Sequence, residues 1–142
     1  MEKKKINYNQ QLEKEIGFSR AVRVGNIIAI SATAPIAKDG SVHSPGNMYG
    51  QTKHCLGIIK DVIEKAGGKM DDVIRTRIFL KDIKRWKEAA KAHGEFFSSS
   101  CIIFSASSSE NGRACDLVGT IWSTVAKVLS GQKTFKFLSL SI

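Results

Sequence analysis

The chain has 142 residues, of which 42% are hydrophobic, and we expect a single domain spanning residues 1–142 with an ordinary core. No run of about 18 apolar residues occurs, which argues against a membrane-spanning helix, and residues 1–15 lack the apolar segment of a secretory signal. The three cysteines, Cys55, Cys101 and Cys115, show no metal-ligand spacing, and they indicate the reducing cytoplasm rather than a disulfide framework.

The formal net charge is +9, and the basic residues are scattered apart from residues 3–5 and 81–91. The simplest interpretation is a solvated basic face together with a frayed N-terminus. The alternative is attraction of anions, either carboxylate substrates or the RNA backbone. The sequence has no RNP-like aromatic motif and no zinc-ligand spacing, so nucleic acid and metal are not the expected partners.

Residues 18–35, FSRAVRVGNIIAISATAP, predict a β-hairpin. Two apolar runs flank Gly25 and Asn26, which adopt the positive φ values of a tight turn at little cost. The second run ends at Ser31, and small residues and Pro35 follow. A strand that ends in this way leaves backbone N–H groups free at a sheet edge or in a cleft, so this end of the hairpin is a candidate site.

Residues 48–66 predict a helix, because apolar residues recur there at helical spacing and two glycines follow as a stop. These apolar positions are Cys55, Leu56, Ile58, Ile59, Val62 and Ile63. Residues 73–80, VIRTRIFL, alternate between apolar and polar residues. This alternation predicts a half-buried strand in which Arg75 and Arg77 share one face.

A second helix is predicted over residues 83–97, with Asp82 as its N-cap. Its expected inner stripe consists of Trp86, Ala89, Ala90, His93, Phe96 and Phe97. We expect Trp86 to pack against the sheet. For His54 on the first helix and His93 on the second, we expect core or surface positions rather than metal ligation, because neither has a second ligand at i+4.

The composition changes after Phe97. Residues 1–97 contain four serines and residues 98–142 contain eleven, whereas only six of the 35 charged residues follow Phe97. Residues 101–106 and part of residues 117–129 resemble two further strands, which would complete the order β-β-α-β-α-β-β. This order predicts an α+β sandwich whose helices pack on one face of a mixed sheet. A reading-frame or splice-site discontinuity after Phe97 is an alternative explanation of the serine-rich end.

Five short motifs occur in the order that is typical of one known family. They are GFSRAVRVGN, ISATAP, the helix start Gln51-Thr52, the run DVIRT, and Asp82 followed by Phe96-Phe97. Residues 17–97 therefore resemble the Rid family, also called YjgF/YER057c/UK114 and including RutC-like proteins, whereas residues 98–142 diverge. The resemblance implies a chorismate-mutase-like fold and a homotrimer. It also implies a deaminase-type hydrolase that converts reactive 2-imino or enamine acids to 2-keto acids and ammonia with no metal or cofactor.

The resemblance also indicates where a substrate would bind. The family's hairpin tyrosine corresponds to Phe18, its strand-end serine is retained as Ser31, and the following glycine corresponds to Ala32. A Pro-Ala-Arg-Ser-Cys type of motif precedes the fifth strand in the family, and its cysteine matches Cys101. These four residues are the expected substrate-binding set. The alternatives are that Ser31 caps its strand and that Cys101 packs as a small hydrophobic residue.

The charged residues of the family site are missing. Ser99 stands where the family has an arginine that binds the substrate carboxylate through its fork of donors. Ala90 replaces an asparagine, and the run ending at Ile121 contains no acid where the family has a glutamate that orients water. No catalytic residue is therefore assigned, and hydrolysis is expected to be weakened or lost. The arginines left to replace the missing one are Arg20, Arg75, Arg77 and Arg113.

Three functions of different classes remain open. The first is a weakened 2-imino acid hydrolase. The second is a non-catalytic trimer whose cleft binds a small ligand, and the third is an RNA-associated protein of the UK114 type. The RNA-associated role ranks last, because it is suggested only by the charge of +9 and by activities of some family members.

Overall fold

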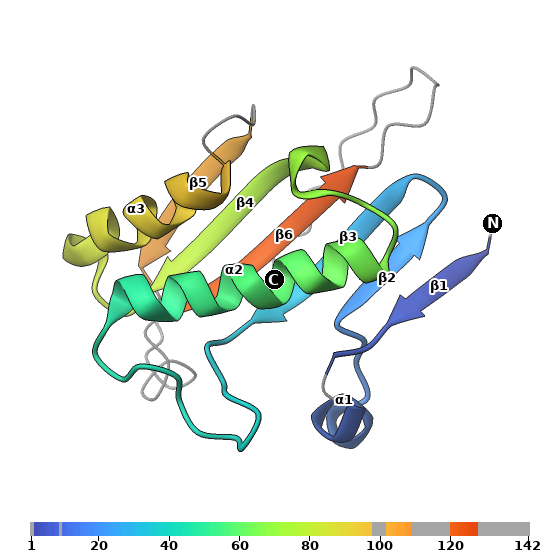
Figure 1. Cartoon of the computed structure of the whole chain (residues 1–142), viewed down its shortest axis with the longest axis horizontal. Helices are drawn as coiled ribbons and strands as arrows, with labels where there is room; N and C mark the ends of the chain where they lie inside the picture. The colour runs from blue at the N-terminus through green and yellow to red at the C-terminus, as the bar shows by residue number, and fades with distance from the viewer. Residues whose placement is uncertain (1, 9, 98–101, 109–119, 128–142) are drawn as a thin grey trace.

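The computed structural model describes residues 2–8, 10–97, 102–108 and 120–127, and it contains one six-stranded sheet (Figure 1). The strands are β1 (Lys3–Ile6), β2 (Ala21–Val24), β3 (Ile27–Thr33), β4 (Val73–Leu80), β5 (Ile103–Ser108) and β6 (Thr120–Lys127). The α-helices are α1 (Gln10–Ile16), α2 (Met48–Lys65) and α3 (Trp86–Phe97), and the 3₁₀ helices are η1 (Met70–Asp72) and η2 (Ile83–Arg85). No helix within these ranges is long and apolar enough to cross a membrane.

The sheet is mixed, with the strand order β1-β2-β3-β6-β4-β5. β4 and β5 are parallel, and all other neighbouring strands are antiparallel. β6 lies between β3 and β4, where Thr124 is the register partner of both Ile30 and Thr76. The last strand therefore joins the N-terminal hairpin to the β4–β5 pair, and it makes one continuous sheet of segments that are distant in sequence.

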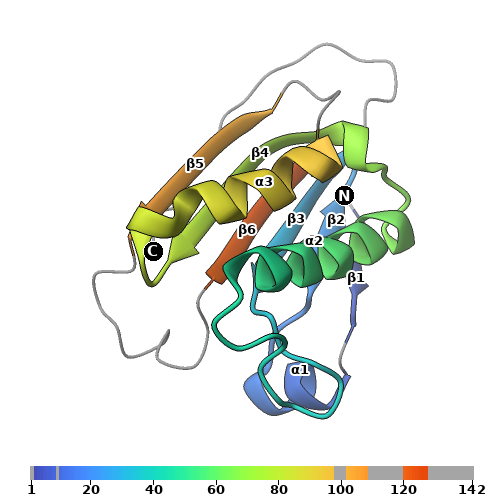
Figure 2. The same cartoon turned by 60° about the vertical axis from the view of Figure 1, so that its left-hand side comes forward.

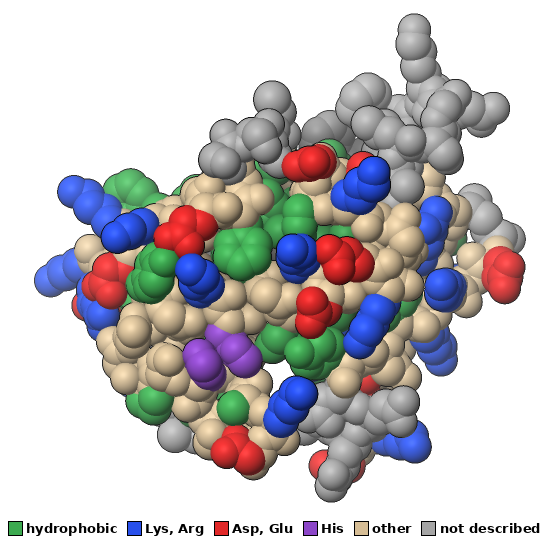
Figure 3. Space-filling model, viewed as in Figure 1, with side chains coloured by type: hydrophobic (Ala, Val, Ile, Leu, Met, Phe, Trp, Pro, Cys, Tyr) green, Lys and Arg blue, Asp and Glu red, His purple; other side chains and the backbone are tan. Residues whose placement is uncertain are grey.

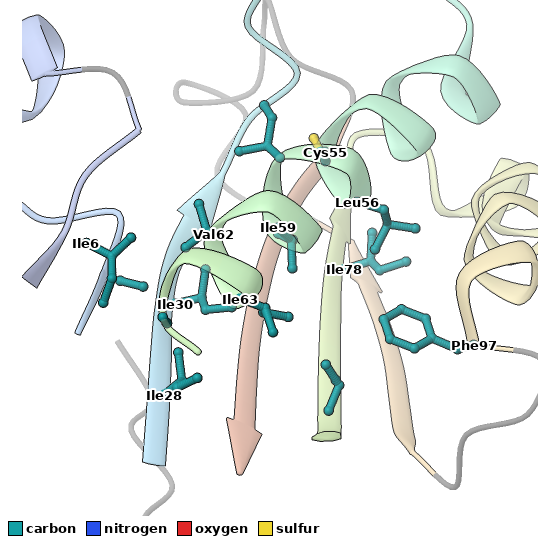
Figure 4. Packing of buried hydrophobic residues seen from close by; sticks show 14 of the residues in the cluster. Ile6, Ile28, Ile30, Cys55, Leu56, Ile59, Val62, Ile63, Ile78 and Phe97 are labelled. Atoms are coloured by element: carbon teal, nitrogen blue, oxygen red, sulfur yellow. The ribbon is translucent and has the colours of Figure 1, made fainter. Parts of the chain in front are cut away.

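Helices α2 and α3 cover the same face of the sheet (Figure 2). Leu56, Ile59 and Ile63 of α2 point toward the sheet and pack in one buried cluster with Ile28 and Ile78 (Figure 4). This arrangement confirms the predicted α+β sandwich with its helices on one face. The hairpin, the helix after it and the strand over residues 73–80 also form where the sequence predicts them.

Local interactions define both ends of α2. Asn47 caps the N-terminus, because its side-chain oxygen accepts the backbone N–H of Gly50 at 2.9 Å. At the other end, Gly67 adopts a φ of +79°, a conformation that favours glycine. Arg23 of β2 donates from Nη1 to the carbonyl oxygen of Ala66 at 2.7 Å, and this contact ties the helix C-terminus to the hairpin.

The N-terminal segment forms ordered secondary structure, so the expectation of a frayed N-terminus was wrong. β1 pairs with β2 in a register that runs from Lys3 opposite Val24 to Ile6 opposite Ala21. Ile6 is buried in the core. The sequence of β1 consists of three lysines and one isoleucine, so it shows no alternation of apolar and polar residues. The strand is held by backbone pairing at the sheet edge and by one buried side chain, and neither produces a periodic sequence pattern.

The second helix differs from the prediction in its first turn and in its inner stripe. Residues 83–85 form η2, and α3 begins only at Trp86. Trp86 is 44% exposed, so the expectation that it packs against the sheet was wrong. Ala92 is buried, whereas Ala90 is only half-buried. His93 is buried, as expected for a core histidine.

Two strands follow α3, as predicted, but their bounds differ. β5 begins at Ile103 rather than at residue 101, and β6 occupies the centre of the segment 117–129. Cys101 and Ser99 lie outside the described residues, as does the segment 128–142.

Candidate functional site

The candidate site lies where β3 ends. The pairing of β3 with β6 shifts register between Ile30 and Thr33, so the strand has an irregularity at Ser31 and Ala32. The backbone N–H of Ser31 donates to the carbonyl of Arg20 at 2.9 Å. Its hydroxyl donates to the carbonyl of Ser19 at 2.7 Å. Ser31 therefore fastens the segment before β2 to the end of β3, which is a capping role.

Phe18 and Ala32 lie beside these hydrogen bonds of Ser31. Arg20 donates from Nη1 to the carbonyl oxygen of Ala32 at 3.0 Å, and its Cζ lies 5.1 Å from the ring centroid of Phe18. Phe18 is half-buried and Ala32 is exposed. The structure thus places three of the four expected substrate-binding residues together, and their role in binding remains a prediction.

A buried carboxylate neutralises Arg20. Glu13 Oε1 lies 3.6 Å from Arg20 Nε, and the two residues are only 3% and 8% exposed. Both carboxylate oxygens of Glu13 also accept the backbone N–H of Tyr8, at 2.9 and 3.1 Å. Arg20 therefore already has an acid and a carbonyl as partners, which makes it a poor candidate for binding a substrate carboxylate.

No sequence signal indicated the contact between Glu13 and Arg20. The two residues are separated by the second half of α1 and by a turn, and α1 itself was not predicted. An acid seven positions before an arginine has no diagnostic spacing. The contact arises only because α1 turns the chain back beneath the hairpin.

Cys55 faces the same strand end from α2. Its thiol donates to the carbonyl oxygen of Thr33, with Sγ and O 3.5 Å apart, and it is fully buried. Burial raises the pKa of the Cys55 thiol well above its ordinary value, and the nearby charge of Arg20 opposes this shift only in part. The thiol stays protonated at neutral pH, so Cys55 is a packing residue and not a nucleophile.

Two histidines lie beside the loop that connects β3 to α2. The rings of His43 and His54 stack with centroids 4.1 Å apart, and His54 Nε2 is 3.2 Å from the carbonyl oxygen of Ile36. The part of the chain that the structure describes has no group of three or more residues that could hold a metal ion. His43 and His54 therefore act as a packing contact between loop and helix.

The remaining candidates fall elsewhere. Ile121 lies in β6, where it is the register partner of Phe79 in β4. The sequence of β6 contains no acidic residue. Arg75 and Arg77 lie on the face of β4 that α2 and α3 do not cover, because Thr76, Ile78 and Leu80 occupy the covered face. Arg113 lies outside the described residues.

This architecture, a mixed six-stranded sheet with two helices on one face, defines the class of chorismate-mutase-like α+β domains. The family model described as Endoribonuclease L-PSP matches residues 8–109. The chain belongs to this family, which is the Rid or YjgF/YER057c/UK114 family.

Relatives support the assignment at the level of sequence and of fold. A RutC family protein of Pyrococcus abyssi is 30% identical over 98 residues, which cover 68% of this chain and 77% of that protein. The crystal structure of Rv2704 from Mycobacterium tuberculosis, a member of the YjgF/YER057c/UK114 family, superposes with a TM-score of 0.77. The match has 25% identity and covers 89% of this chain and all of Rv2704. Yeast Mmf1, at 16% identity and a TM-score of 0.71 over 79% of this chain and 87% of its own, shares the fold.

Proposed function

We propose that this chain binds small molecules at a Rid-type site and hydrolyses 2-imino acids far more slowly than relatives that keep the family arginine, or not at all. The observation that carries the proposal is that the polar side chains at the end of β3 are already paired with groups of the protein. The hydroxyl of Ser31 is bonded to the Ser19 carbonyl, and Glu13 and Arg20 pair with each other behind it. The polar groups of this region are therefore used to hold the fold.

Imine hydrolysis needs a positioned water molecule and a group that accepts its proton. Glu13 is the acid that the structure places near the strand end, but it is 3% exposed and accepts the Tyr8 N–H with both oxygens. A carboxylate in this state cannot approach a bound imine. Ile121, in the strand where the family has its glutamate, has no proton-accepting group.

The carboxylate of an imino acid needs a cation at the site. Arg20 donates to the Ala32 carbonyl and faces Glu13, so it is not free to form a bidentate contact. Ser99 offers a single hydroxyl in place of the family arginine. Loss of a charge-assisted contact weakens binding by about 1.5–3 kcal/mol. Ground-state binding and transition-state stabilisation are expected to weaken together.

Binding without catalysis is the second outcome that these observations allow. Phe18 and Ala32 keep an apolar surface at the strand end, and apolar contact can retain a small ligand after the charged residues are lost. A non-catalytic binding protein and a slow hydrolase share this site. Turnover distinguishes them.

We also propose a homotrimer, on the basis of the family. The exposed Ile27 and Ile103 lie on the face of the sheet that the helices leave uncovered, and large apolar side chains of this kind are typical of an interface. Light scattering at micromolar concentration should give three times the mass of the chain. A stable monomer would contradict this assembly.

The function is tested by kcat/KM for 2-iminobutanoate hydrolysis, measured beside a Rid protein that keeps its arginine. A contact of 1.5–3 kcal/mol corresponds to a rate reduced about ten- to a hundredfold or more. Comparable rates would refute the proposal and show that another group has replaced the arginine. Calorimetry with 2-oxobutanoate then tests whether the site binds a small ligand. The wild type and the control Lys87→Gln on α3 should bind it with the same affinity, and Phe18→Ala should bind it more weakly.

A further inference from the structure

A groove opens to solvent between α2 and α3, on the side of the molecule where the helices lie. It has a volume of about 430 Å³, and it is lined by Lys53, Lys60, Glu64, Met70, Glu95 and Phe96. Figure 3 looks onto this side and shows hydrophobic side chains among the basic and acidic ones. The homotrimer proposed above covers the opposite face of the sheet, so it leaves this groove open.

The floor of the groove is apolar. Met70 and Phe96 are half-buried and pack against the core cluster, and the rest of each side chain lines the groove. One end of the groove is fixed, because Lys53 Nζ lies 3.0 Å from Glu95 Oε2 and links α2 to α3. Tyr49 strengthens this link by donating its hydroxyl to Glu95 Oε1 at 2.5 Å. The helix pair therefore holds the groove in place, and an occupant would gain apolar contact there.

The strand β6 leaves the sheet beside this groove. Ala126 of β6 is the register partner of Val73, and β6 ends one residue later at Lys127. Met70 precedes Val73 by three residues, so Ala126 lies within about 16 Å of Met70. Segment 128–142, which lies outside the described residues, therefore begins close to the groove.

Segment 128–142, VLSGQKTFKFLSLSI, has a composition that matches the groove. Seven of its 15 residues are large and apolar, and none is acidic. Phe135 and Phe137 flank Lys136, and in an extended segment these two rings would share one face and the lysine would occupy the other. The seven residues before Phe135 span up to about 24 Å, which exceeds the distance from the end of β6 to Met70.

We propose that segment 128–142 binds in the groove between α2 and α3 of its own chain. Phe135 and Phe137 cover the apolar floor, and each ring buries about 150–250 Å² when it is fully enclosed. The two lysines of the segment then lie near Glu64 of the groove and near the two acidic residues of η1, whose charge is complementary.

The covalent connection favours this occupant over a second copy. A short connection holds the segment at an effective concentration in about the millimolar range, far above that of other copies in a micromolar solution. A small charged ligand is disfavoured for a different reason. Lys53 and Glu95 are already paired with each other at 3.0 Å, so this end of the groove offers such a ligand no free charge.

The groove is separate from the site at the end of β3. β3 and β4 both pair antiparallel with β6, so they run in the same direction. The groove lies beside η1, where β4 begins, whereas Ser31 lies near the opposite end of the sheet, where β3 ends. Binding of the segment therefore does not depend on imine hydrolysis or on ligand binding beside Phe18.

Methyl NMR of the full chain, with isotope-labelled methionine methyl groups, tests the proposal. Phe135→Ser/Phe137→Ser, the phenylalanine variant, should shift the Met70 resonance, because two aromatic rings leave its surroundings. The Met48 resonance should stay in place, because this side chain is 4% exposed at the start of α2, away from the groove lining. A Met70 resonance at the same position in the wild type and in the phenylalanine variant would overturn the proposal.

Two further samples test how specific the contact is. The matched control Ser139→Ala/Ser141→Ala alters the same segment without removing an apolar side chain, so it should leave the Met70 resonance unchanged. A shift as large as that of the phenylalanine variant would overturn the assignment to the two rings. Mixing the labelled phenylalanine variant with unlabelled wild type should also change nothing. Return of Met70 to its wild-type position on mixing would show that a second copy supplies the segment, and it would overturn the assignment to the same chain.

Trypsin cleavage after Lys133 and Lys136 gives an independent measurement. In the native full chain both bonds should be cut about tenfold or more slowly than in a synthetic peptide of the same segment, because binding protects them. The phenylalanine variant and Met70→Gln should both be cut several-fold faster than the wild type, with circular dichroism as the check that each keeps its fold. Lys87→Gln on α3, a position that does not line the groove, should be cut as the wild type is. Cleavage of the wild type at the rate of the peptide would overturn the proposal.

Discussion

Thr76 Oγ1 and His93 Nε2 lie 2.9 Å apart, hydrogen-bonded in the buried layer between β4 and α3. The imidazole of His93, 7% exposed, also packs against the rings of Phe97 and Phe104, with centroids 4.6 and 4.7 Å away. Burial lowers the pKa of His93 to about 4. The native state therefore holds this histidine in its neutral form.

Stability should fall as the pH drops from about 6.5 to about 4. In that range the unfolded chain protonates His93 and the native state does not, so protons favour unfolding. A pKa difference of this size corresponds to at most about 3 kcal/mol in the free energy of unfolding. Urea unfolding of the wild type and of His93→Gln, which keeps a hydrogen bond to Thr76, should show this pH dependence only in the wild type.

His54→Gln is the matched control, because His54 lies half-buried on α2 rather than in the core. This variant should keep the wild-type slope of stability against pH. If the wild type and His93→Gln lost the same stability between pH 7 and 4.5, another group would be responsible for acid sensitivity.

The fold was predictable wherever burial repeats with a period. α2 and β4 each present one face to the core, and this one-sidedness is visible in residues 48–66 and 73–80. Periodicity reports the angle around a helix axis but not how far the sheet extends beneath the helix. Trp86 has the correct angle for the inner stripe, yet it stands in the first turn of α3 and is exposed.

The candidate site was less predictable, because its contacts involve backbone groups and distant segments. Ser31 donates to a carbonyl of residue 19, and every residue has a carbonyl, so the sequence contains no signal for this bond. Glu13 meets Arg20 only through α1, a seven-residue helix without a marked apolar pattern. Residue types at the site could be predicted, but their hydrogen-bond partners could not.

Gly67 and Gly57 should respond oppositely to replacement by alanine. Gly67 has a φ of +79°, and a Cβ there would lie 2.8 Å from Arg23 Nη1. Gly67→Ala should therefore lower the free energy of unfolding by about 1–2 kcal/mol or more, as Arg23 is displaced from the helix C-terminus. Gly57 lies within α2 with open space around its Cβ position, so Gly57→Ala should stabilise by about 0.5–1 kcal/mol.

Chemical unfolding of these two variants beside the wild type measures both effects. Their difference in sign is the decisive quantity, because a general sensitivity to added side-chain volume would destabilise both. If Gly67→Ala were as stable as the wild type, the end of α2 would not require a glycine at the position with positive φ.

Cys55 should resist alkylation until the protein unfolds. Its thiol is fully buried, donates to the Thr33 carbonyl, and has a raised pKa, so both access and thiolate formation are blocked. Peptide-resolved mass spectrometry after iodoacetamide treatment should show modification of Cys55 in 6 M urea and only slow modification in buffer. Rapid labelling of Cys55 in buffer, with wild-type secondary structure retained, would contradict the burial of this thiol.

Removing the charge of Glu13 should destabilise the strand end. Glu13→Gln keeps an acceptor for the Tyr8 N–H but leaves the buried Arg20 without its counter-charge, and breaking such a pair costs about 3–5 kcal/mol. Arg20→Met removes the cation together with its bond to the Ala32 carbonyl. The double variant should lose less stability than the sum of the two single variants, with a coupling of about 1–3 kcal/mol, because neither charge is then left alone.

A double-mutant cycle by urea unfolding at pH 7 measures this coupling. Asp61→Asn, at an exposed position of α2, is the control for removal of a carboxylate and should change stability by no more than about 0.5 kcal/mol. Additive effects in the cycle would mean that Glu13 and Arg20 act independently at 3.6 Å.

Glu13→Gln should also weaken binding of 2-oxobutanoate, because Arg20 positions both the Phe18 ring and the Ala32 carbonyl. Unchanged ligand affinity with reduced stability would confine the pair to a structural role.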